Sequence, residues 1–380
     1  MMRRFKAEDP ARVQKFIDVV PKGRPAEISE VVDMVAFLAR PENRFITGQD
    51  FSVNGGSAMP RARLQHFQCV ARPVYDRVRK ASSIQYQVRE TDMAEKFPAR
   101  WVMAGRVKTR YIDVGGEEPV LMALHGGGAG SSGSAGMGKL AGRLKDHMRV
   151  VAPDQVGGFG WTDPEAPTPY GQANRVDHLE DFADALCIDK MHLVGNSQGA
   201  WVAARYAVLH PDRVKSMVLI GSGTLGKSMG LPFPPSPGLA ALMGFDGTRE
   251  AMRRMMLALV TDPSNITEEL IDERLASATR PGAAESMKRF GKGNQYLEND
   301  PSMVGVFSLR ESLPAVTKVI PTTVIWGEAD TFVLPETGRQ LEKLLPDARF
   351  FYIPGAGHQT QTDATDEVAR LVRETMAKAG

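Results

Sequence analysis

A hydrophobic segment that runs into Gly-x-Ser-x-Gly and then into a helical stretch places tight limits on the fold of this chain. Residues 193–199 read Leu-Val-Gly-Asn-Ser-Gln-Gly, and residues 200–209 continue as an alanine-rich segment typical of a helix. A strand that turns sharply into a helix lifts the Ser197 hydroxyl clear of the sheet. Gly195 and Gly199 suit so tight a turn, because side chains there would collide with neighbouring backbone. Short motifs of this kind also arise by chance, so the rest of the chain has to support the interpretation.

The composition excludes several other classes of protein. Of the 380 residues, 42% are hydrophobic and 24% are charged, as in globular proteins. A formal net charge of +2 provides no electrostatic basis for binding nucleic acid or an anionic membrane. The two cysteines, Cys69 and Cys187, are too far apart in sequence to indicate a disulfide framework or a metal site. Neither a signal peptide nor a run of about 18 apolar residues is present, so we expect a cytoplasmic protein.

The larger part of the chain has the pattern of an α/β protein. Residues 99–223 and 316–380 alternate short β-branched runs with segments typical of helices. This order predicts a mostly parallel sheet of eight strands with helices on both faces. The expected strands are residues 101–105, 107–113, 118–124, 148–152, 191–195, 216–221, 319–326 and 348–353.

Residues 224–315 interrupt this alternation and predict an all-helical insertion, or lid, packed on the sheet domain. Strand signals stop there, and a proline-rich turn leads into amphipathic segments that contain Met243, Met252, Met255 and Met256. Methionine fills irregular gaps in cores, and its flexible thioether also suits a surface that adapts to apolar substrates. Both roles are compatible with this sequence.

The first 98 residues differ from the rest. Residues 1–59, through a helical segment at 30–38 and a strand-like segment at 45–56, resemble the C-terminal end of a short-chain dehydrogenase. In that family the dinucleotide-binding glycine loop and the Tyr-x-x-x-Lys pair lie upstream, and nothing here supplies them. We therefore expect this segment to bind no NAD(P) and to be catalytically inactive. Residues 60–98 have the composition of a basic, helical linker.

Downstream of Ser197, two strand ends carry the partners that a reactive serine requires. A serine hydroxyl needs a base within hydrogen-bond reach, and that base is oriented by an acid. The strand near 319–326 is followed by Glu328 and Asp330, and the strand near 348–353 by a Gly-x-Gly turn and His358. We prefer Asp330 to Glu328 because it stands just before the apolar pair at 332–333. The order Ser197, Asp330, His358 fits a triad at the carboxyl ends of the strands.

A glycine-rich loop, His-Gly-Gly-Gly-Ala-Gly at 125–130, follows the expected strand 118–124. Glycines let a substrate oxygen approach backbone N–H groups that side chains would block. We therefore expect an oxyanion hole made by the amides of Gln198 and of Gly127 or Gly128. A phosphate-binding loop is excluded because the required lysine and serine or threonine ending is missing. His125 is expected to be structural.

Together these segments resemble the meta-cleavage product hydrolases, a branch of the α/β-hydrolases that cleaves carbon–carbon bonds in 2-hydroxy-6-oxohexa-2,4-dienoates. The resemblance rests on the glycine loop, the Gly-Asn-Ser of the turn, and the segment 264–270 followed by Arg274. It implies an α/β-hydrolase fold with a helical lid, and no cofactor and no metal. It further implies that Asn196 lies against the dienoate, that Ser264 and Arg274 hold its carboxylate end, and that Phe332 lines the pocket of the departing acyl group.

Three positions depart from that family's pattern. Gln359 stands where tryptophan is usual, no asparagine occurs near Gly136, and Gln198 replaces the common methionine or leucine. The triad is unaffected, but the pocket becomes more polar. A carboxylesterase or lactonase with the same triad stays open as an alternative, as does a homo-oligomer. The expected partner is a small dienoate or ester molecule, with no role for nucleic acid or membrane.

Overall fold

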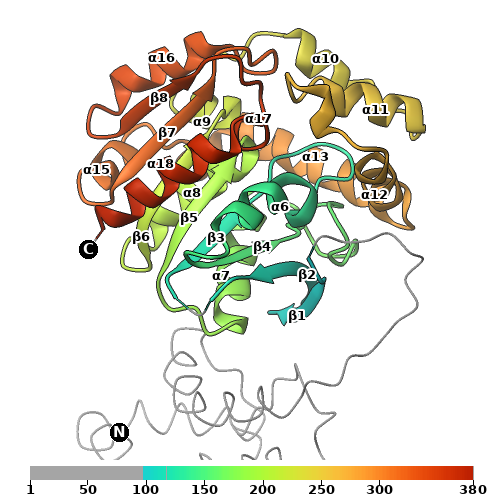
Figure 1. Cartoon of the computed structure of the whole chain (residues 1–380), viewed down its shortest axis with the longest axis horizontal. Helices are drawn as coiled ribbons and strands as arrows, with labels where there is room; N and C mark the ends of the chain where they lie inside the picture. Colours follow the sequence, from blue (N-terminus) through green and yellow to red (C-terminus); the bar gives the residue numbers. More distant parts are fainter. Residues whose placement is uncertain (1–96, 117, 380) are drawn as a thin grey trace, which may run out of the picture. The chain divides into compact units, whose positions relative to one another are not determined.

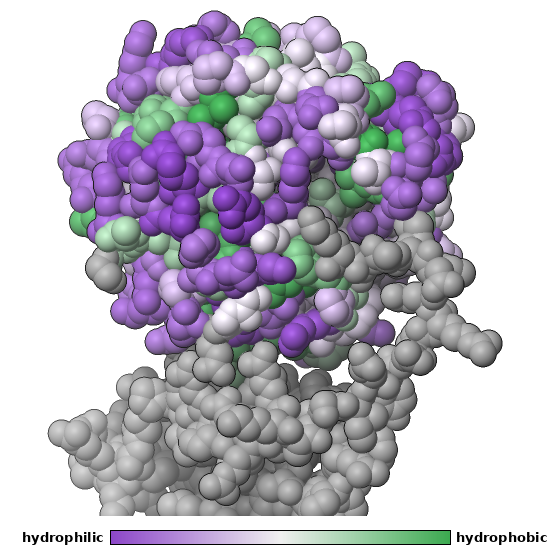
Figure 2. All heavy atoms as spheres, in the orientation of Figure 1, coloured by the Kyte–Doolittle hydropathy of each residue, from purple (hydrophilic) through white to green (hydrophobic). Residues whose placement is uncertain are grey.

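The computed structural model describes residues 97–116 and 118–379, which belong to one compact unit. The expected dehydrogenase-like segment at 1–59 lies outside the described residues, as does the expected linker at 60–98 except for its last two residues. Within the described part, no helix is long and apolar enough to cross a membrane. The face of the molecule drawn in Figure 2 is mostly hydrophilic, with apolar residues scattered in small groups.

Eight strands form one sheet, as the alternation of the sequence predicted. Their order across the sheet is β1-β2-β4-β3-β5-β6-β7-β8. Strand β2 pairs antiparallel with β1 on one side and with β4 on the other, and all further pairs are parallel. The strands are β1 (Arg100–Ala104), β2 (Val107–Val114), β3 (Val120–Leu124), β4 (Arg149–Pro153), β5 (Met191–Asn196), β6 (Val214–Ile220), β7 (Thr322–Gly327) and β8 (Arg349–Ile353).

Helices cover both faces of the sheet because successive residues of its central strands point to opposite sides. In β5, Leu193 joins one apolar core and Val194 the other. The second core includes residues of α6 and α18, which lie in front of the sheet in Figure 1. The helices of the sheet domain are α6 (Gly133–Leu144), α7 (Ala173–Ala185), α8 (Gln198–Leu209), α9 (Gly223–Ser228), α15 (Leu313–Thr317), α16 (Pro335–Leu344), α17 (Thr360–Asp363) and α18 (Thr365–Ala377).

Between β6 and β7 the described chain is helical throughout, and its central part gathers at one side of the sheet (Figure 1). Met252, Met255 and Met256 are buried in a core of their own with Ala129 of the glycine loop, whereas Met243 is 78% exposed. Most of the methionines therefore fill the lid core and join it to the glycine loop. These elements are α10 (Pro237–Met243), α11 (Arg249–Leu257), η4 (Pro263–Asn265), α12 (Glu268–Thr279), α13 (Ala283–Asn299), η5 (Pro301–Met303) and α14 (Val304–Phe307).

Candidate active site

Ser197 occupies a strained turn between β5 and α8. Its backbone has φ 56° and ψ −120°, a conformation that costs a non-glycine residue free energy and that clusters at functional sites. Its amide donates a hydrogen bond to the Ile220 carbonyl at 2.8 Å, which ties the turn to β6. A Cβ on Gly195 would lie 2.3 Å from the Gly199 carbonyl oxygen. The close approach of backbone thus explains the glycine that precedes the serine.

An acid and a base lie together past the ends of β7 and β8. The Nδ1 of His358 is 2.9 Å from Oδ2 of Asp330, and both side chains are buried. The other oxygen, Oδ1, accepts the amides of Phe332 at 2.7 Å and Val333 at 2.9 Å. Because a carboxylate only accepts hydrogen bonds, Nδ1 of the imidazole carries the proton and Nε2 keeps a free lone pair. Glu328, the rival acid, instead forms a surface ion pair with Arg339.

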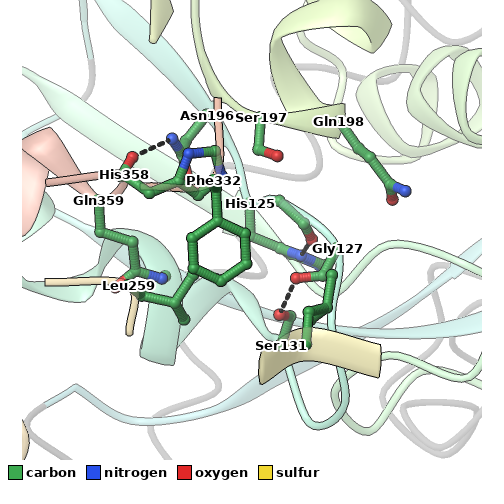
Figure 3. Close-up of a pocket in the computed structure, with 13 residues that line it drawn as sticks. His125, Gly127, Ser131, Asn196, Ser197, Gln198, Leu259, Phe332, His358 and Gln359 are labelled. Atoms are coloured by element: carbon green, nitrogen blue, oxygen red, sulfur yellow. Dashed lines mark hydrogen bonds between the residues drawn. The ribbon is translucent and has the colours of Figure 1, made fainter. Parts of the chain in front are cut away.

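Ser197 and His358 line one cavity, so the fold brings the serine and the acid–base pair to one place (Figure 3). In the described part of the chain the serine hydroxyl makes no hydrogen bond to the imidazole. Catalytic hydrogen bonds often shorten only when substrate binds. The cavity has a volume of about 60 Å³, which is small beside the roughly 300–1,000 Å³ of ligand pockets. Leu242 and Leu259 close it from the lid side.

The glycine loop presents free amides to this cavity. The N–H groups of Gly127, Gly128 and Gln198 donate no hydrogen bond within residues 97–116 and 118–379, which is the state expected of an oxyanion hole. Ser131 holds the shape of the glycine loop, because its hydroxyl donates to the Gly127 carbonyl at 2.8 Å. Such an arrangement of amides can stabilise a developing oxyanion next to Ser197.

His125 has a structural place in this loop. It is fully buried, its Nδ1 donates to the Gly126 carbonyl at 2.7 Å, and its Nε2 accepts the Gln155 amide at 2.9 Å. Burial, together with the nearby charge of Arg175, lowers the pKa of His125 to about 3. The ring is therefore neutral and fully engaged at neutral pH.

Of the two lid residues that sequence reasoning assigned to the substrate, one lies next to the residues that line the cavity. Arg274 of α12 is buried and donates to the Ala129 carbonyl at 2.9 Å and to Ser131 Oγ at 3.0 Å. Burial lowers the pKa of Arg274 to about 10, which leaves it protonated at neutral pH. Because Ser131 lines the cavity, Arg274 lies directly behind its wall.

Ser264 does not line the cavity, and its expected contact with a substrate stays a prediction. It is exposed on η4, where its amide donates to the side chain of Asp262 at 2.9 Å. This local turn holds it on the outer side of the lid. Ser131, which sequence reasoning missed, supplies the hydroxyl beside Arg274 instead. Its only sequence signal was its place directly after the glycine loop.

Asn196 and Phe332 both line the cavity, and both also brace the histidine (Figure 3). The Nδ2 of Asn196 donates to the carbonyl of His358 at 3.1 Å and, more weakly, to that of Ile220 at 3.3 Å. The ring of Phe332 stacks on the imidazole. Gln359, the residue after the histidine, completes the wall on this side.

Comparison with known proteins agrees with this geometry. Residues 119–365 match the family described as alpha/beta hydrolase fold. Over 279 residues the chain is 32% identical to 2-hydroxy-6-oxo-2,4-heptadienoate hydrolase of Pseudomonas putida, a match that covers 73% of this chain and 96% of that protein. This chain belongs to the meta-cleavage product hydrolase family. The expected α/β-hydrolase fold is thereby confirmed.

Further members of the family show the same extent of similarity. The 2-hydroxy-6-oxo-6-(2'-aminophenyl)hexa-2,4-dienoic acid hydrolase of Metapseudomonas resinovorans is 32% identical over 280 residues, covering 73% of this chain and 91% of its own. The meta-cleavage product hydrolase CumD of Pseudomonas fluorescens IP01, solved as a mutant complexed with acetates, has a TM-score of 0.61 at 31% identity. That match covers 74% of this chain and 98% of CumD.

Proposed function

We propose that this meta-cleavage product hydrolase is a serine-dependent enzyme that cleaves the C5–C6 bond of 2-hydroxy-6-oxohexa-2,4-dienoates. The observation that carries the proposal is the buried guanidinium of Arg274. It hydrogen-bonds to Ser131, which lines the same cavity as Ser197, and it forms no ion pair within the described part of the chain. A generic ester substrate has no need for a cation at that place.

The energetics of Arg274 favour an acidic substrate. A buried cation without a carboxylate partner is destabilising, and an anion that binds beside it removes that penalty. Its planar fork also suits the carboxylate and 2-oxo oxygens of a dienoate in its keto form. The Nε of Arg274 is buried and has no hydrogen-bond partner within residues 97–116 and 118–379, so one donor remains for such a ligand.

Leu242 of α10 lines the cavity close to this cation. A Cβ built on Gly128 would lie 2.9 Å from Cδ1 of Leu242 and 3.5 Å from a terminal nitrogen of Arg274. Both side chains therefore lie beside the same glycine of the loop. In the proposed reaction the substrate displaces Leu242, which also enlarges the small cavity.

The reaction itself uses only groups of this chain. The Nε2 of His358, oriented by Asp330, removes a proton from Ser197 or from a water that attacks the C6 ketone. The amides of Gln198 and of Gly127 or Gly128 stabilise the oxyanion. The C5–C6 bond then breaks, C5 takes a proton, and C6 leaves as a carboxylic acid after one water is consumed. Attack by serine and attack by water both use this same arrangement, and the steps call for no metal and no organic cofactor.

The test compares an acidic diene with a neutral ester. Arg274→Met keeps the packing of the arginine stem and should lower kcat/KM for a 2-hydroxy-6-oxo-dienoate by about 10²-fold or more, because charged hydrogen bonds contribute about 1.5–3 kcal/mol each. The loss with p-nitrophenyl acetate should be several-fold smaller. Arg249→Met is the control, since Arg249 pairs on the lid surface with Glu268 and Asp272.

We also expect the protein to act in the cytoplasm. Two outcomes of the assay would favour ordinary ester chemistry over carbon–carbon cleavage. One is a wild-type enzyme that hydrolyses the ester and leaves the yellow dienoate unbleached. The other is an Arg274→Met variant that loses both activities equally while staying folded by circular dichroism. Either result would favour a carboxylesterase or lactonase.

A further inference from the structure

A second buried guanidinium lies beside Gln198, which lines the cavity. Arg175 of α7 is fully buried, and its guanidinium carbon is 4.3 and 4.4 Å from the ring centroids of Phe159 and Phe290. It donates from Nε to the Val156 carbonyl at 3.2 Å and from one terminal nitrogen to Oε1 of Gln198 at 3.1 Å. The other terminal nitrogen is buried without a partner, and no carboxylate pairs with Arg175 in the described part.

Arg175 sets the direction of the Gln198 amide. A guanidinium only donates hydrogen bonds, so the oxygen of Gln198 must face it, and Nε2 must point the other way. Gln198 lines the cavity, and its Nε2 donates no hydrogen bond within residues 97–116 and 118–379. The amide lies against the glycine loop, because a Cβ on Gly127 would be 2.6 Å from Oε1 and 3.1 Å from Nε2 of Gln198. The Gln198 amide thus keeps a free N–H donor beside the glycine loop.

The two cations flank one short segment of backbone. Gln198, held by Arg175, contacts Gly127, and Arg274 reaches the adjacent Gly128. The charges of both arginines contribute to the low pKa of His125 at the start of the same loop. In Figure 3, Gln198 and the Arg274 partner Ser131 lie at one end of the cavity, and Phe332 and Leu259 lie at the other. The end with Gln198 and Ser131 is therefore backed by both cations, whereas Phe332 and Leu259 at the other end lie beside the polar side chain of Gln359.

We propose that Gln198, oriented by Arg175, is a second recognition element for the oxygen-rich end of the substrate. Its Nε2 donates a hydrogen bond to a carboxylate or 2-oxo oxygen, in addition to the contact with Arg274. Gln198 is the specificity-determining residue, and Arg175 is a positioning residue that does not touch the substrate. This inference rests on the proposed function and deepens it, because it concerns the same site and the same acidic substrate.

The orientation of the amide also strengthens the donor. A hydrogen bond from a cation to Oε1 polarises the amide, so its N–H groups become better donors. A hydrogen bond to a charged acceptor contributes about 1.5–3 kcal/mol, which corresponds to about a ten- to hundredfold change in kcat/KM. The same bond contributes nothing toward a neutral ester that has no acidic end.

Two substitutions of Gln198 test the proposal with opposite electrostatics. Gln198→Met keeps the length of the side chain and removes the donor, so the ratio of kcat/KM for the dienoate over p-nitrophenyl acetate should fall about ten- to hundredfold. Gln198→Glu keeps a partner for Arg175, which favours folding, but presents a carboxylate to the substrate, so the ratio should fall further. Gln340→Met, at an exposed position of α16, is the matched control. A ratio that stays within threefold of wild type in both Gln198 variants would overturn the proposal.

The positioning role of Arg175 is tested by a double-mutant cycle. If Arg175 acts through Gln198, Arg175→Met should lower the same ratio, and Arg175→Met with Gln198→Met should lower it no further than the single changes. Additive losses would show that Arg175 acts on the substrate by another route and would contradict the assignment. Should Arg175→Met fail to fold, Arg175→Lys replaces it, because its single ammonium cannot bind both Val156 and Gln198 in the same way.

A competition experiment separates this inference from the function on which it rests. Pyruvate, a small 2-oxo acid, should inhibit ester hydrolysis by the wild type, and its inhibition constant should rise at least tenfold in Gln198→Glu. If the wild type cleaves no dienoate but shows this inhibition pattern, the proposed function fails and the recognition element stands. If pyruvate inhibits wild type and Gln198→Glu equally, the recognition element fails, whatever the dienoate assay shows.

Discussion

The phenyl ring of Phe332 stacks on the imidazole of His358, with centroids 4.8 Å apart and planes inclined by 21°. The backbone amide of the same phenylalanine donates to Oδ1 of Asp330. One residue therefore holds the acid through its backbone and the base through its ring. Because the ring also lines the cavity, Phe332 links the alignment of the histidine to the shape of the pocket.

Replacing Phe332 should separate these two contributions. Phe332→Leu retains the amide that binds Asp330 and part of the buried volume, but it removes the aromatic surface over His358. We expect kcat to fall about tenfold with p-nitrophenyl acetate, because the imidazole becomes free to rotate. Phe332→Ala should lose the same alignment and in addition about 3–5 kcal/mol of unfolding free energy. Equal kcat values for wild type and Phe332→Leu would show that the stacking has no catalytic role.

The choice between the two acids after β7 has a direct test. Asp330→Asn keeps the shape but lets the amide face Nδ1, which favours the wrong imidazole tautomer, and kcat should fall by about 10⁴ as in other triads. Glu328→Gln removes only a surface ion pair with Arg339, which should change stability by less than about 1 kcal/mol and leave kcat near wild type. Comparable losses of kcat in both variants would reject Asp330 as the orienting acid.

Leu242 should limit access to Arg274. Leu242→Ala removes the side chain beside Gly128, so we expect KM for a dienoate to fall severalfold, most of all for substrates with a bulky end. Its unfolding free energy should drop by less than the roughly 2–5 kcal/mol of a fully buried leucine, since Leu242 is half-buried. Met243→Ala, at the neighbouring exposed position, serves as the control. An unchanged KM in steady-state kinetics of Leu242→Ala would show that this side chain does not restrict entry.

Buried histidines should make the fold sensitive to acid. Burial lowers the pKa of His178, which contacts Thr109 Oγ1 at 2.7 Å, to about 3. Its unfolded pKa is about 6.5, so between pH 6.5 and 3 the unfolded chain binds the extra proton and stability falls as the pH is lowered. One such proton changes the free energy of unfolding by about 1.4 kcal/mol per pH unit.

The contribution of His178 to the pH dependence of the unfolding free energy can be measured by mutation. His178→Gln should lower the pH dependence of the unfolding free energy, measured by urea denaturation between pH 6 and pH 4, by about one proton relative to wild type. His147→Gln, at an exposed site, is the matched control. Parallel curves for wild type and His178→Gln would mean that His178 titrates alike in the folded and unfolded states.

Much of this architecture follows from local sequence patterns. Each of the eight expected segments overlaps a strand, and the buried, mostly apolar runs of the central parallel strands leave the strongest signal. The turn at Ser197 was predictable because its glycines are required by close backbone contacts. The pairing of Asp330 with His358 was predictable because parallel strands end at one edge of the sheet.

The lid contains contacts that local sequence patterns do not predict. Segment 264–270 carries a motif, but its serine lies on the outer side of the lid, because a local turn capped by Asp262 sets its direction. The hydroxyl that accompanies Arg274 comes from Ser131, far away in the sequence. A side chain's neighbours across two packed elements depend on the rotation of each helix, and motif spacing contains no information about that rotation.

The sequence by itself determined the strand-to-helix turn, the order of serine, acid and base, and the alternation that builds the sheet. All of these depend on backbone conformation or on periodicity within one segment. Only the tertiary structure decided which charges lie next to the cavity wall. Arg175 of α7 binds Gln198, Arg274 of the lid binds the glycine loop, and each is buried by residues distant in the chain. Burial is what makes an unpaired cation a binding feature, and burial is a property of the folded assembly of segments.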